Sequence, residues 1–543
     1  MRTHGDKFGR GRNADFGRVN QPISVPARQH HSYGDFSKGY FSANDHGEVP
    51  DGGTDNALDV EITRKDRLVP VPGIALVETY LAQSPGQMVL HAGLEGVAEL
   101  VLFAPPFIGV YTEDGTAWED IGLAASTRPV AHTNFGSTLI FSNGYGAVRA
   151  RQFGGSVSTL PDAPVARTYA SFAGRVFAGY AEIDGNHEPL GMRWSDADSD
   201  YRHWTGLGSG AELLIDDMSQ GDHIVAARSM GLDLMAVVLR KSIWLGRRTG
   251  LRDRPADFTP RVAGLGAVSE RTVKVTRFGL VMLTDEGVAL FDGNQLRIVS
   301  EAINAELLPL DLNQLAYYHA TYNPRTGQYL LFTPAGTWVY DMPKQRWFPK
   351  RSLIARASSM YAPFIPGPTW DELVGTWDEQ TQTWEDMRPE ETGELYLMVL
   401  ADAEVEGISL GREEPLVTTN FGVPTAPFWE FPYRRGEFLN QLMLIQSVGM
   451  TYIGGGTVGI RVPNIEGDMR TVSDPEGYTL PATALPRIRT MHGNVSGLGL
   501  GVRLDFLTGR PEIGQVQLGF QPRGPRIEGS SFTPREFYED FLG

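Results

Sequence analysis

A repeated strand-turn-strand pattern constrains the fold of this chain more than any single motif does. The stretch VMLTDEGVALFD (281–292) matches LLFTPAGTWVYD (330–341) position by position, 49 residues further along. Each copy runs from an apolar triplet through threonine, a two-residue turn, glycine and a second apolar run to aspartate. Because glycine adopts the positive φ values that other residues resist, each copy predicts two antiparallel strands joined by a tight turn.

Three further stretches fit the same frame less closely, at 102–111, 139–148 and 237–245. A single hairpin cannot bury its apolar faces, so these units must pack against one another. Radial packing of units that repeat about every 40 to 50 residues is the arrangement of a β-propeller. We therefore expect an all-β chain with a propeller of about five to seven blades; a β-sandwich with long loops is the alternative fold.

The remainder of the chain supports the all-β class. Helical periodicity is scarce, and the best helix candidate, residues 300–315, is interrupted by Pro309. After about residue 417 the strands become longer, and two of them, 502–506 and 516–520, alternate strictly between apolar and polar residues. This alternation is typical of half-buried antiparallel strands, and it predicts an appended β-sandwich-like domain.

The predicted organisation has four parts and one insertion. The ranges are an extended N-terminal arm at 1–55, the propeller at 56–416 with a strap at 366–390, the sandwich-like domain at 417–529 and a C-terminal tail at 530–543. The arm is basic and lacks periodicity, which suits an extended segment or a dispensable leader. The tail carries Phe537, Tyr538 and Phe541 beside charges, which suits docking on a neighbouring subunit or a frayed terminus.

Composition excludes several classes of function. The chain has 543 residues and a formal net charge of −17, which argues against a surface that grips nucleic-acid phosphates. Cysteine is absent, so disulfides, thiolate metal sites and a cysteine nucleophile are excluded. No apolar run approaches the roughly 18 residues of a membrane span, and we expect synthesis and assembly in the cytoplasm.

Three aspartates are the one weak candidate for a metal site. The stretch WSDADSDYRHW places Asp196, Asp198 and Asp200 at alternate positions, which could turn three carboxylates toward a calcium ion. An EF-hand loop requires glycine and glutamate where Tyr201 and Leu207 stand. A solvated loop is the preferred interpretation, so we expect no metal and no cofactor.

Motifs for hydrolytic chemistry are equally weak. GISLG (407–411) satisfies the pattern of a nucleophile elbow, but Pro415 and β-branched residues stand where the following helix should begin. YTEDGTAW (111–118) resembles the Asp-box turn of sialidase-like propellers, with one residue missing and a single occurrence. We therefore expect no catalytic residues and a protein that is not an enzyme.

Three Thr-Trp-acid triplets at seven-residue intervals mark the strap. They place Trp370, Trp377 and Trp384 in a segment that also contains Gly375 and three threonines that precede the tryptophans. Such residues make a poor helix, so a coiled-coil seam is disfavoured. The alternative is an acidic extended strap whose indole rings pack on the propeller, or a plain surface loop.

The order of several stretches along the chain carries a family resemblance. These stretches are DGGTDNALDVEITRKDRLVPVPGI (51–74), FAGRVFAG (172–179), MRWSDADSDYRHW (192–204), VVLRKSIWLGRRTG (237–250), TDEGVALFDGNQLRIVSEAIN (284–304) and NPRTGQYLLFTPAGTWVYDMPKQRW (323–347). In this order they resemble the successive blades of the tail nozzle or hub proteins, also called packaged-DNA stabilisation proteins, of short-tailed bacteriophages. The resemblance covers about residues 51–415.

The resemblance implies a structural virion protein of the phage tail. It implies a ring of copies, usually six, beneath the portal and the head-to-tail adaptor, which retains packaged DNA and lets it pass during ejection without sequence-specific binding. Tail fibres or spikes would attach to such a ring. An acidic lumen would repel DNA and allow it to slide, in keeping with the net charge.

Two other classes of function stay open at the level of sequence. One is a carbohydrate-binding or carbohydrate-active propeller, such as a lectin, a depolymerase or a sialidase-like protein. The other is a head-surface or fibre-anchoring virion protein with the same fold. Convergent carboxylates at the blade loops would mark the first class, and the sequence does not assign any.

Overall fold

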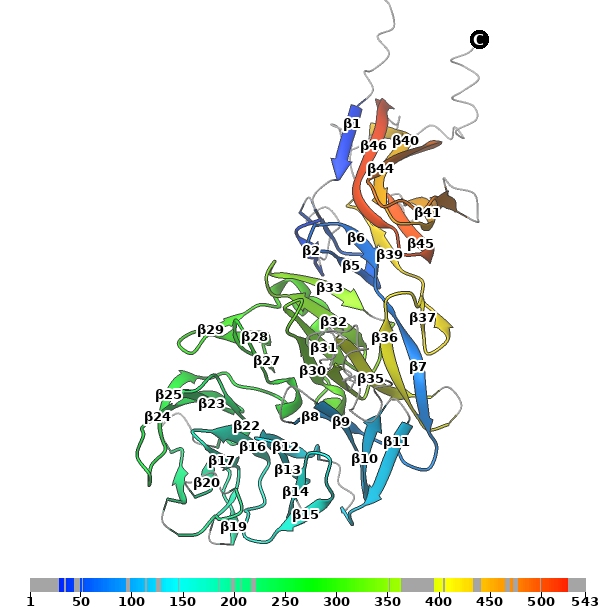
Figure 1. Ribbon diagram of the computed structural model, residues 1–543. Helices are drawn as coiled ribbons and strands as arrows, with labels where there is room; N and C mark the ends of the chain where they lie inside the picture. The colour runs from blue at the N-terminus through cyan, green and yellow to red at the C-terminus, as the bar shows by residue number, and fades with distance from the viewer. Residues whose placement is uncertain are drawn as a thin grey trace, which may run out of the picture.

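The computed structural model is all-β, as the sequence predicts (Figure 1). It describes residues 29–33, 36–42, 49–50, 52–93, 98–112, 115–123, 128–144, 146–183, 185–196, 201–206, 208–215, 221–350, 352–362, 395–403, 406–432, 441–463, 469–471, 477–498 and 500–525. Within these ranges, α-helix is confined to α1 (Asn304–Leu307). Two 3₁₀ turns flank it in the predicted helical stretch, and Pro309 lies between α1 and the second, since proline lacks the amide hydrogen that a continuing helix needs.

Six four-stranded antiparallel sheets follow one another along the chain, and we number them ring sheets 1 to 6. Ring sheets 1 to 3 contain β8 (Gln87–Ala92), β9 (Ala98–Ala104), β10 (Phe107–Thr112) and β11 (Gly115–Asp120); β12 (Ala131–Phe135), β13 (Thr138–Ser142), β14 (Val148–Gln152) and β15 (Val157–Leu160); and β16 (Thr168–Phe172), β17 (Arg175–Gly179), β20 (Gly191–Trp194) and β21 (Gly210–Leu213). A short hairpin of β18 (Glu182–Ile183) and β19 (Asn186–His187) interrupts ring sheet 3.

Ring sheets 4 to 6 repeat the same strand order. They contain β22 (Ile224–Ser229), β23 (Leu234–Leu239), β24 (Ser242–Arg248) and β25 (Ala256–Ala263); β26 (Lys274–Thr276), β27 (Gly279–Thr284), β28 (Gly287–Phe291) and β29 (Leu296–Ile298); and β30 (His319–Asn323), β31 (Gln328–Thr333), β32 (Gly336–Asp341) and β33 (Arg346–Lys350). Each ring sheet is thus built largely from local hairpins.

Ring sheet 7 is assembled from distant parts of the chain. Its first three strands are β34 (Ala357–Tyr361), β35 (Tyr396–Asp402) and β36 (Ile408–Glu414), and its fourth is β7 (Gly73–Tyr80). Two short strands, β37 (Thr419–Asn420) and β38 (Val423–Pro424), extend it. The stretch GISLG therefore lies at the start of β36 and continues as an ordinary strand rather than turning into a helix.

The seven ring sheets form a closed circuit. The first strand of each sheet contacts the next sheet, and β34 of the last ring sheet contacts β8 of the first. Side chains fasten neighbouring sheets: the amide of Gln87 exchanges two hydrogen bonds with the backbone of Val130, at 2.8 and 2.9 Å. This arrangement is consistent with the expected β-propeller (Figure 1).

The repeated hairpins share one turn, as the sequence predicts. Thr284 accepts a hydrogen bond from the amide of Glu286 at 3.2 Å and donates one to the carbonyl of Gly287 at 2.8 Å. Thr333 makes the equivalent bonds to Ala335 and Gly336 in the next sheet. Gly287 has a φ of 119°, and a Cβ atom there would lie 2.3 Å from Ser300 Oγ. Glycine is therefore required at this turn.

Two six-stranded sheets form a second unit, which we call the sheet unit. One sheet contains β44 (Arg487–Leu498), β40 (Gln441–Ile453), β46 (Glu512–Pro525), β6 (Leu68–Pro70), β5 (Val60–Ile62) and β1 (Gln29–Tyr33); the other contains β4 (Ala57–Leu58), β39 (Phe428–Glu430), β45 (Arg503–Gly509), β41 (Gly456–Pro463), β42 (Met469–Thr471) and β43 (Tyr478–Leu480). Both sheets bury side chains in one hydrophobic core, and in Figure 1 the unit lies above the ring sheets.

Residues from the predicted N-terminal arm belong to this core. β1 pairs with β46 along its whole length, from Gln29 opposite Phe520 to Tyr33 opposite Val516. The Tyr33 ring is buried and packs against Phe431, with ring centroids 4.6 Å apart. A parallel pair, β2 (Gly39–Tyr40) and β3 (Gly53–Thr54), follows, and β2 contacts β33 of the ring.

A buried arginine joins the sheet unit to ring sheet 6. The side chain of Arg346 is fully buried and bonds Asp341 Oδ2 at 3.1 Å and Asp66 Oδ1 at 2.8 Å. Its second terminal nitrogen donates to the carbonyls of Ile62 and Thr63, each at 3.1 Å. One guanidinium group therefore connects β33 of the ring with the β5–β6 turn of the sheet unit.

Candidate functional site: the central cavity

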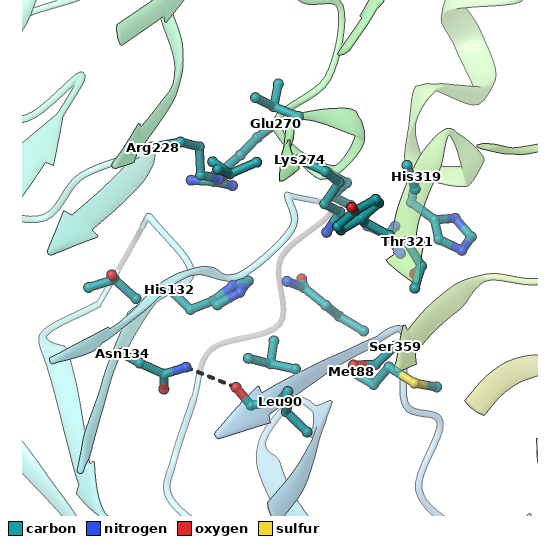
Figure 2. Close-up of a pocket in the computed structure, with 18 of the residues that line it drawn as sticks. Met88, Leu90, His132, Asn134, Arg228, Glu270, Lys274, His319, Thr321 and Ser359 are labelled. Carbon is teal, nitrogen blue, oxygen red and sulfur yellow. Dashed lines mark hydrogen bonds and ion pairs between the residues drawn. The ribbon is translucent and has the colours of Figure 1, made fainter. Parts of the chain in front are cut away.

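The first strands of all seven ring sheets surround a cavity of about 490 Å³. Each ring sheet contributes residues to the wall of this cavity. One example from each sheet, in order, is Met88, Asn134, Ser171, Arg228, Lys274, Thr321 and Ser359. Figure 2 labels several of these side chains, among them Asn134, Arg228 and Thr321, on different strands around the cavity. The circular order of the sheets therefore brings together residues that lie far apart in the sequence.

Cationic side chains gather on one side of the cavity, where ring sheets 4 and 5 meet. Arg228 comes from β22, Lys274 begins β26, and Arg271 lies in the 3₁₀ turn Glu270–Thr272 that leads into β26. Arg228 Nη2 lies 3.2 Å from Glu270 Oε1, and its other terminal nitrogen donates to Thr168 Oγ1 at 3.3 Å. Arg228 thus fastens ring sheet 4 to the sheets on either side.

Arg271 and Lys274 differ in their partners. A terminal nitrogen of Arg271 donates a hydrogen bond to the backbone carbonyl of Arg356. Among the residues that the structure describes, Lys274 has no hydrogen-bond or ion-pair partner for its ammonium group. Burial and the nearby Arg228 and Arg271 lower the pKa of Lys274 to about 8. Burial also lowers the pKa of Arg271 to about 10.

The pKa of Glu270, the one carboxylate in this group, shifts in the opposite direction. Burial raises the pKa of Glu270 above its ordinary value, and the Arg228 guanidinium counteracts only part of that rise. Both directions have the same cause, because a buried site disfavours whichever form carries charge. The local field on this side of the cavity is therefore positive, although the whole chain has a net charge of −17.

Two histidines face the cavity in their neutral form. Burial, together with the positive charge of Arg228, lowers the pKa of His132 to about 3, although part of its side chain remains exposed to the cavity. Burial lowers the pKa of His319 well below its usual value, and the charge of Arg271 adds to this effect. The His319 ring stacks on Phe332, with ring centroids 4.5 Å apart.

Several polar atoms in the cavity wall have no hydrogen-bond partner within the described part of the chain. Asn134 donates to the carbonyl of Leu90 at 3.0 Å, as Figure 2 shows, but its side-chain oxygen is left without a donor. His319 Nε2 and the Tyr322 hydroxyl are also unpaired. Buried polar groups are ordinarily satisfied, so these atoms mark places where water or a small molecule can bind.

A second cavity of about 270 Å³ adjoins the first and shares Glu270 and Arg271 with it. Its wall includes Arg128, Arg167 and His223, which lie just before the first strands of ring sheets 2, 3 and 4. The Arg167 guanidinium lies over the Tyr180 ring, 3.7 Å from its centroid. More basic groups thus lie beside the central cavity.

The site residues suggested by the sequence lie elsewhere. Asp196 follows β20; its amide donates to the carbonyl of His203 at 2.8 Å, and its carboxylate lies 3.8 Å from the Arg252 guanidinium. Asp198 and Asp200 lie outside the described residues, so the carboxylate cluster stays a prediction. Trp370, Trp377 and Trp384 of the strap, and Phe537, Tyr538 and Phe541 of the tail, also lie outside the described residues.

Sequence reasoning missed the cavity residues for a physical reason. Met88 and Ser359 line the same cavity but lie far apart in the sequence. No local spacing connects them, because only closure of the circuit brings them together. His132 and His319 stand at similar places, near the start of β12 and at the start of β30, but the sequence does not mark these strands as the first of their sheets.

Two further observations concern metal ligands and membrane-spanning helices. Within the described ranges, no three His, Asp or Glu side chains lie close enough together to hold a metal ion. The helices of the described residues include none with the length and apolar character of a membrane span.

Comparisons with known proteins give weak structural likeness. No family model and no curated protein matches the chain. The extracellular domain of a hybrid two-component system of B. thetaiotaomicron matches 64% of the chain with a TM-score of 0.38 and 13% identity. The chain spans 40% of that structure's length. The U3-55K protein matches 63% of the chain with a TM-score of 0.36 and 8% identity, over its full length. These values are too low to argue fold or function.

Proposed function

We propose that the protein is a structural component of a bacteriophage tail, in which copies form a nozzle or hub ring below the portal and adaptor. In this proposal the seven ring sheets are the blades of a β-propeller and the sheet unit is its sandwich-like appendage. The ring of copies retains packaged DNA, provides its exit channel, and offers attachment points for fibres or spikes. The chain acts as a rigid building block and not as an enzyme.

The positions of the resembling stretches support this proposal. FAGRVFAG (172–179) covers the β16–β17 turn and β17, and VVLRKSIWL (237–245) spans the β23–β24 hairpin. NPRTGQYLLFTPAGTWVYD (323–341) spans β31 and β32. These stretches lie in hairpins of ring sheets 3, 4 and 6, which supports the assignment of each stretch to a separate blade.

An exposed edge strand is the observation that carries the ring-forming part of the proposal. β44 is 12 residues long and, among the described strands, pairs only with β40. Leu485, just before β44, is 74% exposed, and Ile488 on the strand is 75% exposed. A long edge with exposed apolar side chains is a template for pairing with another chain. We propose that it contacts a neighbouring copy.

The size of the central cavity limits where DNA can pass. A cavity of about 490 Å³ holds a small molecule. It is far too small for a double helix, whose major groove alone is about 12 Å wide. The DNA channel of this proposal therefore lies between copies, and the negative net charge of the chain keeps its wall from binding phosphates.

Mass measurement and electron microscopy test the proposal. The purified chain should give, by light scattering, a mass several times the 59.6 kDa of one copy, and negative-stain images should show rings. Ile488→Lys should reduce the mass toward one copy, because it places a charge in the proposed contact. Leu232→Lys is the matched control, since Leu232 is 83% exposed on the β22–β23 loop of the ring.

Two results together would contradict the proposal. One is a single-copy mass for the unaltered chain at micromolar concentration, alone and with purified connector complexes. The other is absence of the chain from purified phage tails by mass spectrometry. A mass that falls equally in both variants would remove β44 as the contact while leaving the ring itself to be located elsewhere.

A further inference from the structure

The balance of charge in the central cavity is unusual for a protein interior. Arg228, Arg271 and Lys274 face the cavity from neighbouring ring sheets, and Glu270 is the only carboxylate among the described residues that line it. His132 and His319, the other titratable bases there, are neutral. Buried charges are ordinarily paired, because leaving them uncompensated opposes folding. Lys274, which has no partner among the described residues, thus leaves a positive charge in the cavity wall that a bound anion would neutralise.

Hydrogen-bond donors are available for such an anion. Lys274 offers three donors and has no partner among the described residues. The neutral His319 adds no donor, because its Nδ1 lies 3.0 Å from the Tyr317 carbonyl and therefore carries the one ring proton. An ammonium group without a partner beside two guanidinium groups is a feature of an oxyanion site.

We propose that the central cavity is a binding site for a small oxyanion with at least two negative charges. The ligand is a polycarboxylate or a phosphate compound, bound mainly by Lys274, with Arg228 and Arg271 beside it. A volume of about 490 Å³ lies within the range of small-molecule sites. This inference does not depend on the proposed tail function, since it concerns one copy of the chain.

The second cavity places further positive charge beside the central one. It shares Glu270 and Arg271 with the central cavity and is also lined by Arg128 and Arg167. Cationic groups around a cleft raise the local concentration of an anion. Neutral sugars would gain nothing from these groups, so ligand charge separates this proposal from a carbohydrate site.

Isothermal titration calorimetry with citrate, inorganic phosphate and glucose tests the proposal at low ionic strength. We expect saturable binding of citrate or phosphate with one site per chain, and no binding of glucose. Lys274→Met should weaken the anion affinity about tenfold or more, because it removes a charged donor. Lys274→Arg should largely retain it. Lys241→Met, at an exposed lysine in the β23–β24 turn, is the matched control and should bind like the unaltered chain.

The pH dependence gives a second readout. Lys274 is faced by Arg228 and Arg271, by Glu270, and by the neutral His132 and His319. Its pKa of about 8 means that it loses its charge as pH rises from 7 to 9. We expect the anion affinity of the unaltered chain to be about tenfold lower at pH 9 than at pH 7, and that of Lys274→Arg to change much less.

The calorimetric titrations distinguish the two classes of ligand and can also overturn the proposal. Citrate binding that phosphate does not displace assigns a polycarboxylate, and the reverse assigns a phosphate compound; both support the site. Glucose binding, the absence of binding by either anion, or anion binding that Lys274→Met leaves unchanged would overturn it. Lys274→Met should fold, because it removes a charge whose burial opposes folding; thermal melting without anions should show an equal or higher Tm.

Discussion

At the scale of single residues, buried bases make stability depend on pH. The pKa of His132 is about 3 in the folded chain, below the ordinary 6.5 of an unfolded histidine. Between these two values the unfolded chain binds more protons, so the folded state loses stability as pH falls below 6.5. His319 shifts in the same direction and adds to the effect. Above pH 6.5 neither histidine contributes to the pH dependence.

Replacing His132 should reduce the loss in the free energy of unfolding that occurs as pH falls below 6.5. At pH 5 the unaltered chain loses up to about 2 kcal/mol through this histidine, because each unit of pKa difference corresponds to about 1.4 kcal/mol. His132→Asn removes that loss, whereas His187→Asn, at an exposed histidine on β19, should leave the profile unchanged. Urea unfolding at pH 7 and pH 5 measures the difference. Parallel losses in all three proteins would contradict the assignment.

Residues of the turns were predictable from the sequence, and residues of the cavity were not. Thr284 and Gly287 lie three positions apart, and their pattern recurs at Thr333 and Gly336, so a local repeat identifies them. Lys274 carries no such mark, because its meaning depends on the distant strands that complete the cavity. Residues that interact with near neighbours can be recognised in a sequence. A site built from distant residues forms only when the seven ring sheets close into a circuit.

At the scale of the elements, the threonine turn is the device that each repeated hairpin uses. Thr284 is fully buried, and its hydroxyl both accepts from Glu286 and donates to Gly287. Thr112 makes the same donation to Gly115 at 2.9 Å on an exposed hairpin. The two sites therefore share a bond but differ in solvent access.

Thr284→Val should destabilise the chain by about 1–3 kcal/mol, because the shape is kept while buried backbone groups lose their partner. Thr112→Val should cost less, because water replaces the lost bond at the exposed turn. Chemical denaturation of the two variants gives the comparison. Equal effects would show that burial of the turn does not set its contribution.

Some strands follow from local sequence preferences, whereas others form only because of tertiary packing. The sequence predicted the hairpins well, because alternating apolar residues and turn glycines act locally. It did not predict the assembly of ring sheet 7, since β7 and β36 pair across more than 300 residues of chain. Likewise β1, within the range expected as an extended arm, is a strand because β46 offers it an edge.

At the scale of the whole molecule, we expect the junction at Arg346 to couple the unfolding of the ring and of the sheet unit. Its guanidinium is fully buried and bonds Asp341 on one side and Asp66 on the other. Removing one partner of a buried ion pair leaves the other charges without compensation. The junction thus contributes to both units.

Arg346→Met should lower the free energy of unfolding by about 3 kcal/mol or more. It should also separate the thermal unfolding of the two units into two calorimetric transitions. Arg254→Gln is the control, because Arg254 is half-exposed and forms only surface ion pairs with Glu212 and Asp257. A single transition at an unchanged Tm in Arg346→Met would show that the junction is not shared.

The pairing of β1 with β46 sets the order in which the chain can be completed during synthesis. Ring sheets 1 to 6 each close from neighbouring strands, so they can form as they leave the ribosome. Ring sheet 7 waits for β36, and the core of the sheet unit waits for residues 512–525. β40 pairs with both β44 and β46, so the sheet that contains the β44 edge is complete only after residues 512–525 have been synthesised. A chain that stops before residue 512 would lack β46 and leave one edge of β40 without its partner strand.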